Sequence, residues 1–228
     1  MANCILSGNK PISGSGSSVV FPSCNFKNVG TTSCLPITSD GWVDYTQNTF
    51  TNNNVNYLEL SNIFTPGSQA WEMCFKIRFT QTNSHLNTII GNDAFTVPYI
   101  GYTGNIQSQW VSPRHFFVGY TVSPTEYIMY ELYSQNSFAM DGDYCVKMVW
   151  DTEYVKLYVS SNDGVTWSLE ASQAVSDPHY QQSNSPIYIG TKAITSSSSM
   201  ADQLFNCGSI NIMHSYIKFG NTVVWGNE

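Results

Sequence analysis

The chain has 228 residues, of which 42% are hydrophobic and 14% aromatic, so it can bury a sizeable core. Only 11% are charged, well under the roughly 25% of an ordinary globular domain, and the surface must therefore consist mainly of Ser, Thr, Asn, Gln and Tyr. A net charge of −7 with nine scattered basic residues excludes nucleic-acid binding by phosphate neutralisation, and the lack of an apolar run of ~18 residues excludes membrane insertion.

The N-terminal 40 residues differ from the rest of the chain. Residues 1–7 lack the basic start and long apolar stretch of a signal peptide, so we expect synthesis in the cytoplasm; the alternative is a signal already removed and replaced by Met1. A Ser/Gly run at 13–18 and three prolines interrupt regular structure. We therefore divide the chain into an irregular N-terminal arm or docking segment, 1–40, and one domain, 41–228. The arm either orders against a partner or wraps its own domain.

From residue 41 onward the sequence alternates with a two-residue period. The odd positions of 71–79 and the even positions of 143–150 are apolar, as expected of strands with one buried and one solvated face. Residues 153–160 repeat the pattern and form a predicted hairpin with 143–150. No segment has a convincing 3.6-residue period, so the chain is predicted to be all-β, a sandwich or jelly roll. Further strands are expected at 55–61, 86–91, 114–122, 126–133, 166–173, 186–190, 209–219 and 222–225.

Six cysteines are present, without the Cys-x-x-Cys or Cys/His spacing of a zinc site. We expect most of them to be reduced and buried, because a free cysteine packs as a small hydrophobic residue. A disulfide such as Cys24–Cys34 is the alternative in an extracellular setting.

The carboxylates and histidines show no recognisable catalytic arrangement. Asp141 and Asp143, like Asp151 and Glu153, have the two-residue spacing that places carboxylates on one face of a strand, but each pair falls at a predicted turn. We expect solvated turn carboxylates, with a weak calcium site as the alternative. The four histidines are far apart, and no phosphate-binding loop is present. The sequence therefore predicts no catalytic residue, no metal ligand and no cofactor.

Residues 160–167, Ser-Ser-Asn-Asp-Gly-Val-Thr-Trp, resemble the Asp-box hairpin of sialidases and related β proteins, Ser-x-Asp-x-Gly-x-Thr-Trp. Asn162 stands where that pattern has Asp. The role implied is structural: the polar side chain ties the turn, Gly164 allows it, and Trp167 anchors the following strand. A single copy predicts a hairpin and not a sialidase.

An aromatic and polar segment, 99–110, has the composition of a sugar-binding surface. Sugar rings stack on Trp and Tyr, while amide and charged side chains bind their hydroxyls. We therefore single out Tyr99, Tyr102, Trp110, Arg114 and His115 as candidate glycan-binding residues, on a loop or weak strand. The alternative is that the aromatic residues complete the core or a sheet edge.

The order of elements in the C-terminal half resembles concanavalin-A-like (laminin-G-like) modules of tailed-phage and prophage virion proteins. The hairpin 143–160, the Ile-Tyr-Ile-Gly strand at 187–190, a Ser-rich loop and the closing strands 208–218 and 222–225 carry the resemblance, which extends over about 55–228. It implies an antiparallel two-sheet jelly-roll sandwich of the concanavalin-A-like lectin and glucanase type. The glucanase pattern Glu-x-Asp-x-x-Glu is absent, and no binding residue of the family carries over.

Resemblance and composition together lead to one functional expectation. We expect a non-enzymatic phage virion structural protein, a head decoration, fibre or tail component that is made in the host cytoplasm and resides in the virion. Its expected partners are other virion proteins, bound through the arm, further copies of itself in a homo-oligomer, and a host-surface glycan. The alternative is a soluble or cell-surface carbohydrate-binding lectin-like module. A glycoside hydrolase is disfavoured because the carboxylate pattern is missing.

Overall fold

All regular structure that the computed structural model describes is β-strand. The described residues are 4–5, 25–29, 37–49, 55–60, 69–91, 98–106, 112–121, 129–175, 187–192 and 204–228. No helix among them is long and apolar enough to cross a membrane. The strands are β1 (Cys4–Ile5), β2 (Asn25–Val29), β3 (Trp42–Asp44), β4 (Val55–Leu60), β5 (Trp71–Phe79), β6 (Asn87–Gly91), β7 (Tyr99–Tyr102), β8 (Phe116–Thr121), β9 (Met129–Tyr133), β10 (Asp143–Trp150), β11 (Tyr154–Ser160), β12 (Ser168–Ala174), β13 (Ile187–Ile189), β14 (Gly208–Phe219) and β15 (Thr222–Gly226).

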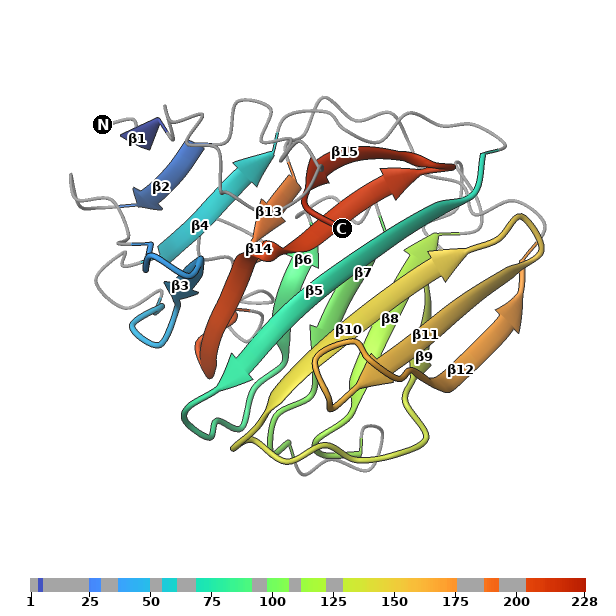
Figure 1. The fold of residues 1–228 in the computed structure, drawn as a ribbon. Helices are drawn as coiled ribbons and strands as arrows, with labels where there is room; N and C mark the ends of the chain where they lie inside the picture. The colour runs from blue at the N-terminus through green and yellow to red at the C-terminus, as the bar shows by residue number, and fades with distance from the viewer. Residues whose placement is uncertain are drawn as a thin grey trace.

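The strands form two antiparallel sheets packed face to face (Figure 1). An eight-stranded sheet has the order β1-β2-β4-β13-β6-β7-β8-β9, and a seven-stranded sheet has the order β12-β11-β10-β5-β14-β15, with β3 also paired to β14. Strands distant in sequence are neighbours, as in β5 beside β14. The predicted all-β two-sheet jelly-roll sandwich is confirmed.

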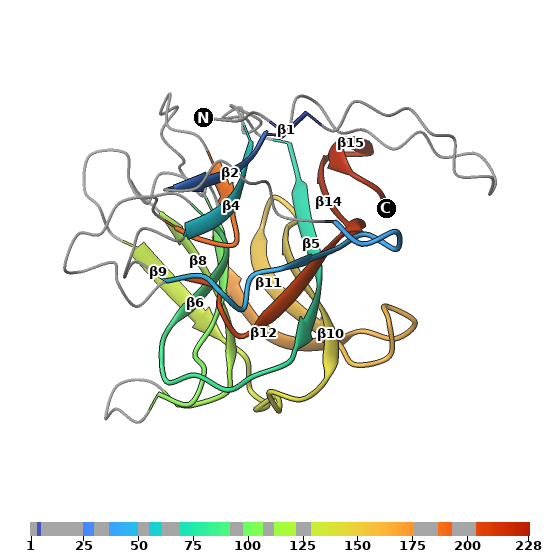
Figure 2. The same ribbon diagram turned by 90° about the vertical axis from the view of Figure 1, so that its left-hand side faces the viewer.

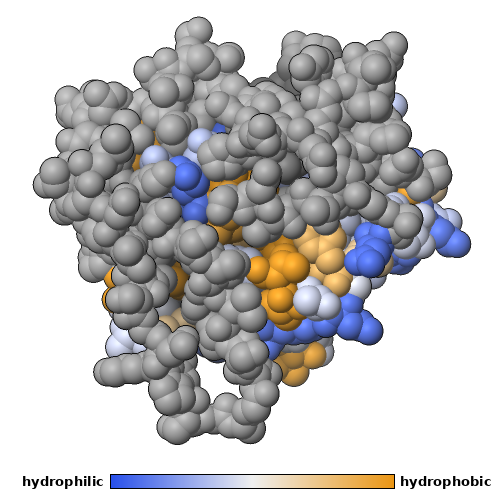
Figure 3. All heavy atoms as spheres, turned by 90° about the horizontal axis from the view of Figure 1, so that it is seen from above, coloured by the Kyte–Doolittle hydropathy of each residue, from blue (hydrophilic) through white to orange (hydrophobic). Residues whose placement is uncertain are grey.

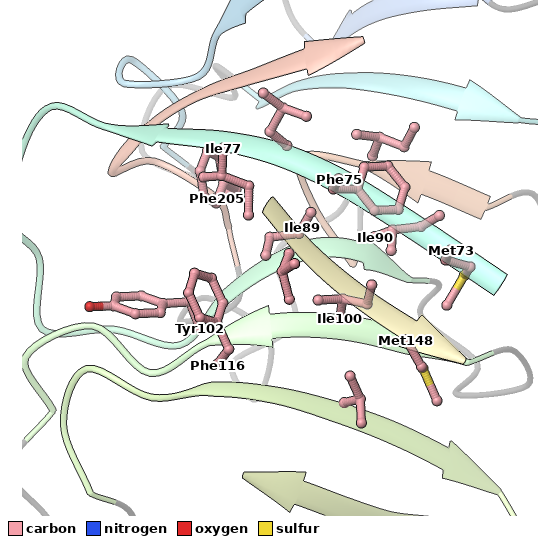
Figure 4. Packing of buried hydrophobic residues seen from close by; sticks show 14 of the residues in the cluster. Met73, Phe75, Ile77, Ile89, Ile90, Ile100, Tyr102, Phe116, Met148 and Phe205 are labelled. Atoms are coloured by element: carbon pink, nitrogen blue, oxygen red, sulfur yellow. The ribbon is translucent and has the colours of Figure 1, made fainter. Parts of the chain in front are cut away.

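The core lies between the sheets and follows the predicted alternation. Met73, Phe75 and Ile77 of β5 point inward and are fully buried, as are Val146 and Met148 of β10. Figure 4 shows side chains from both sheets meeting in this layer. Because the side-chain period of a strand is two, burying one set of residues fixes the intervening set on the outer face of the sheet.

The predicted strands are confirmed with small shifts of their ends. The β10–β11 hairpin turns at Asp151–Glu153, where Thr152 has φ 84°, and the β14–β15 turn places Gly220 at φ 53°. The sequence missed β3, and residues 99–102, expected as a loop or weak strand, form the buried strand β7.

Part of the predicted N-terminal arm is strand. Asn25–Val29 pairs along its whole length with β4, and β1 pairs with β2 at the edge of the eight-stranded sheet. Ile37 forms a bridge with Val43. These segments therefore extend the chain's own sandwich, and the description "irregular" is wrong for them. The role of arm residues 1–3, 6–24 and 30–36, which lie outside the described ranges, stays a prediction, and so does the Cys24–Cys34 disulfide.

Candidate functional site

The two tyrosines predicted to bind a glycan lie on opposite faces of β7, and both are buried. Tyr102 points into the core, is 0% exposed and packs with its ring centre 4.5 Å from that of Phe79. Tyr99 lies on the outer face of the eight-stranded sheet and is 3% exposed. Neither ring has a free face on which a sugar could stack, so the alternative, that these aromatics complete the structure, holds for both.

Tyr99 is held by a polar cluster on its own sheet. Its hydroxyl donates to Glu131, which also accepts from Tyr133. The buried Lys192 places its ammonium 4.5 Å from the centre of the Tyr99 ring. Burial raises the pKa of Tyr99 and lowers that of Lys192 to about 7. The ring lies against Gly119, where a Cβ would come within 2.0 Å of it.

The other predicted site residues do not join them. Arg114 is exposed, has φ 64°, and donates from Nε to Asn105 Oδ1 at 2.8 Å. His115 Nδ1 lies 2.6 Å from the carbonyl oxygen of Ser134, so it ties the start of β8 to the end of β9. Trp110 lies outside the described residues, and its role stays a prediction. The structure thus brings no two of the described candidates into one exposed site.

A different surface gathers chemically useful side chains: the outer face of the seven-stranded sheet, which is the nearer sheet in Figure 1. Strand register aligns its residues in rows across four strands, β11, β10, β5 and β14. One row reads Tyr158, Lys147, Cys74, Tyr216, and the next reads Lys156, Val149, Glu72, Lys218. We call this surface the outer face.

Five of the nine basic residues of the chain lie on the outer face. All five rest against aromatic rings. Arg78 and Lys76 are 4.1 and 5.7 Å from the ring centre of Trp42. Lys147 is 4.3 Å from that of Trp167, Lys156 5.5 Å from that of Tyr154, and Lys218 5.4 Å from that of Tyr216. These cations are far apart in the sequence because they come from four different strands, which the fold places side by side. The sequence indicates them only as polar residues that alternate with the apolar residues of each strand. The five are Lys76, Arg78, Lys147, Lys156 and Lys218.

The Asp-box loop between β11 and β12 bends over this face, and Figure 2 shows it extending beyond the sheet. Asn162 ties the turn, accepting from the Ser160 hydroxyl at 2.9 Å and from Thr166 N at 2.9 Å. Asp163 and Gly164 have φ of 62° and 80°. The predicted roles of Asn162 and Gly164 in the turn are confirmed; the anchoring of the following strand by Trp167 stays a prediction. The structure adds that the loop carries Trp167 to Lys147.

Asp163 ties the loop to the sheet through Lys76, whose ammonium is 2.5 Å from Oδ1 of Asp163. The hydrogen bond from Lys76 holds the pKa of the Asp163 carboxyl below its ordinary value. At the edge of the face, Arg78 binds Asp143 through two nitrogens, Nη2 at 2.8 Å and Nε at 2.9 Å. Ion pairing therefore fixes both the loop and the strand end.

The carboxylates predicted at turns form hydrogen bonds and ion pairs within the fold. Asp143 holds Arg78, and Asp151 accepts from the backbone N–H groups of Glu153 and Tyr154 at 3.1 and 2.8 Å. No group of three or more His, Cys, Asp or Glu within the described ranges could hold a metal ion. Ser134 Oγ is 3.3 Å from His115 Nδ1 but donates to a carbonyl oxygen, that of Asn136.

Three cysteines are free and buried, as predicted: Cys74, Cys145 and Cys207. Burial raises the pKa of Cys145 to about 11 and raises that of the other two as well. These thiols therefore stay protonated near neutral pH and are poor nucleophiles.

The outer face combines aromatic rings, ammonium and guanidinium donors, and carboxylate acceptors on a rigid sheet. Tyr158 and Trp167 are half-buried, and Tyr154 is exposed. Aromatic rings beside hydrogen-bonding groups can bind polar molecules that also have apolar faces. Figure 3 views the molecule from above and not onto the outer face; among the described residues that it shows, hydrophilic and hydrophobic side chains lie beside one another.

Compared by sequence, the chain matches no family profile and no curated protein. Its structure resembles the enzymatically active domain of tailspike protein 2 from bacteriophage CBA120, with a TM-score of 0.57, 12% identity, and coverage of 92% of this chain and 30% of that one. It also resembles domains LG4-5 of the mouse laminin α1 chain, with a TM-score of 0.52, 8% identity, and coverage of 84% of this chain and 44% of that one.

A third similar structure is domain 4 of an extracellular arabinanase from Geobacillus stearothermophilus, in complex with arabinotriose. The TM-score is 0.51 at 12% identity, and the match covers 88% of this chain and 82% of that one. The chain spans less than half the length of the tailspike and laminin structures. At these identities the likeness establishes the fold, a laminin-G-like jelly-roll sandwich.

Proposed function

We propose that this chain is a non-enzymatic carbohydrate-binding module that uses the outer face of its seven-stranded sheet. The observation that carries the proposal is the convergence of Tyr158 and Trp167 on Lys147, beside the Lys76–Asp163 pair. Sugars bind proteins by stacking an apolar ring face on an aromatic side chain while polar groups take the hydroxyls. The rings and the polar groups of this cluster lie on strands or on a tied loop, so they are already placed for binding.

The structural comparisons support this function without establishing it. The arabinanase domain is seen with an arabinose oligosaccharide bound, so a sandwich of this kind can present a sugar site. The low charge content favours the same function, because the surface offers many neutral hydrogen-bonding groups.

We further propose that the module is part of a phage virion, as a head decoration, fibre or tail component. The fold likeness to a phage tailspike protein supports this location. The same sugar-binding role in a soluble or cell-surface lectin is the alternative. Light scattering on the full chain tests the assembly: we expect a homo-oligomer at micromolar concentration, and a monomer that binds no virion protein would remove the virion role.

A glycan array tests carbohydrate binding, using the full chain and two variants of one loop. Trp167→Ala removes the ring beside Lys147, and we expect it to abolish binding. Val165→Ala is the matched control, because Val165 is 79% exposed and makes no part of the cluster. Circular dichroism confirms that both variants fold. An array without hits for the full chain, or binding unchanged in Trp167→Ala, would contradict the proposal.

A further inference from the structure

Lys147 differs from the other four cations of the outer face in its acidic partner. Arg78 and Lys76 have carboxylate oxygens at 2.8 and 2.5 Å, and Lys156 and Lys218 are hydrogen-bonded to Asp151 and Glu228. In the described part of the chain, the nearest acidic oxygen to Lys147 Nζ is Glu72 Oε1 at 3.7 Å. That distance exceeds the ~3.2 Å limit of an N–H···O hydrogen bond.

The Glu72 carboxylate is already engaged by other groups. Its Oε1 accepts a hydrogen bond from the Tyr216 hydroxyl and lies 3.6 Å from Lys218 Nζ. Tyr216 and Lys218 sit on β14, on the side of β5 away from Lys147. The carboxylate is therefore drawn toward β14, and the ammonium of Lys147 retains N–H donors that no protein group in the described ranges accepts at hydrogen-bond distance.

Two aromatic rings flank this ammonium. Its Nζ is 4.3 Å from the ring centre of Trp167 and 5.5 Å from that of Tyr158, directly opposite Lys147 in the strand register. Ring faces attract a cation but cannot accept its N–H groups as a carboxylate does. The Lys147 side chain is 18% exposed, so a ligand at the surface can reach it. An anionic group of a ligand placed there would accept hydrogen bonds from the Lys147 ammonium. The rest of the ligand would then cover one of the two aromatic rings.

We propose that Lys147, Trp167 and Tyr158 form a subsite for a carboxylated sugar, such as a uronic or sialic acid residue. The carboxylate binds Lys147, and the apolar face of the sugar ring stacks on Trp167. This inference rests on the proposed carbohydrate-binding function and adds the charge of the ligand. Because the chain carries a net charge of −7, its overall field does not attract an anion, and this local cation must provide the preference.

Isothermal calorimetry on the full chain tests the subsite with matched ligands. The probes are tetragalacturonic acid, a hyaluronan tetrasaccharide and sialyllactose, each beside its methyl ester, which keeps the ring and loses the charge. We expect at least one acid to bind ten or more times more tightly than its ester, since a charge-assisted hydrogen bond contributes about 1.5–3 kcal/mol.

Two variants locate the preference. Lys147→Gln should bring the acid down to the affinity of the ester, whereas Lys156→Gln, which changes a cation that has its own carboxylate, should keep the preference. Equal affinities for every acid and its ester, or a preference that survives Lys147→Gln, would overturn the subsite. If one of those results is obtained while neutral glycans on the array bind and lose binding in Trp167→Ala, the carbohydrate-binding function stands and only the subsite falls.

Discussion

Replacing Phe75 with alanine tests the register on which both the core and the outer face depend. The Phe75 side chain is fully buried, and its ring is stacked 6.0 Å from that of Trp225. A buried Phe→Ala change costs about 3–5 kcal/mol, because apolar contact is lost and a cavity remains. Unfolding entropy is about 2.1 cal/mol/K per residue, so a 228-residue chain loses roughly 2 °C of Tm per kcal/mol. We therefore expect Tm to fall by about 6–10 °C.

The neighbouring residue supplies the control. Lys76 lies on the outer face, and its partner Asp163 has a side chain that is 63% exposed. Removing such an ion pair costs at most about 1 kcal/mol, so Lys76→Ala should lower Tm by no more than about 2 °C. Thermal unfolding followed by circular dichroism measures both variants. Equal losses of Tm would show that β5 does not present alternate residues to core and solvent, and the positions assigned to the outer face would fall with it.

Three further predictions concern the two sheet faces. Gly119→Ala should destabilise the fold by about 1–3 kcal/mol, since its Cβ would lie 2.0 Å from the Tyr99 ring, and an unchanged urea midpoint would contradict this packing. Asp163 should titrate below its ordinary pKa of about 4 in carbon-detected NMR and return toward it in Lys76→Ala; the stability it contributes is complete above about pH 4 and is lost as the pH falls through the lowered pKa. Lys192→Met should gain most stability over the parent below pH 7 and progressively less toward pH 10, because the pKa of the buried amine is about 7 when folded and about 10.4 when unfolded; a gain that does not vary with pH would refute this.

The fold could be predicted from the sequence, but the position of the candidate site could not. The segment 99–110 has the composition of a sugar-binding loop, but β7 lies between two strands of its sheet, and its tyrosines are covered on both faces. The Asp-box motif was recognised as a turn, and its geometry is as expected. That this turn reaches across to Lys76 and Lys147 depends on which strands are neighbours, and one sequence does not state that.

What the sequence determined by itself is local. Alternation in 71–79 and 143–150 decides which side chains are buried, since a strand has two faces and only one can meet the core. The residue types at 160–167 likewise decide the turn. Tertiary structure alone decided which outward-facing residues of distant strands meet, because the pairs of β14 with β5 lie 129 to 148 positions apart, from Gly208 with Phe79 to Phe219 with Trp71. The β10–β11 hairpin sets Lys147 opposite Tyr158. The long-range register of β14 beside β5 places Tyr216 and Lys218 where they engage Glu72, and it thereby completes the surface on which the proposed function rests.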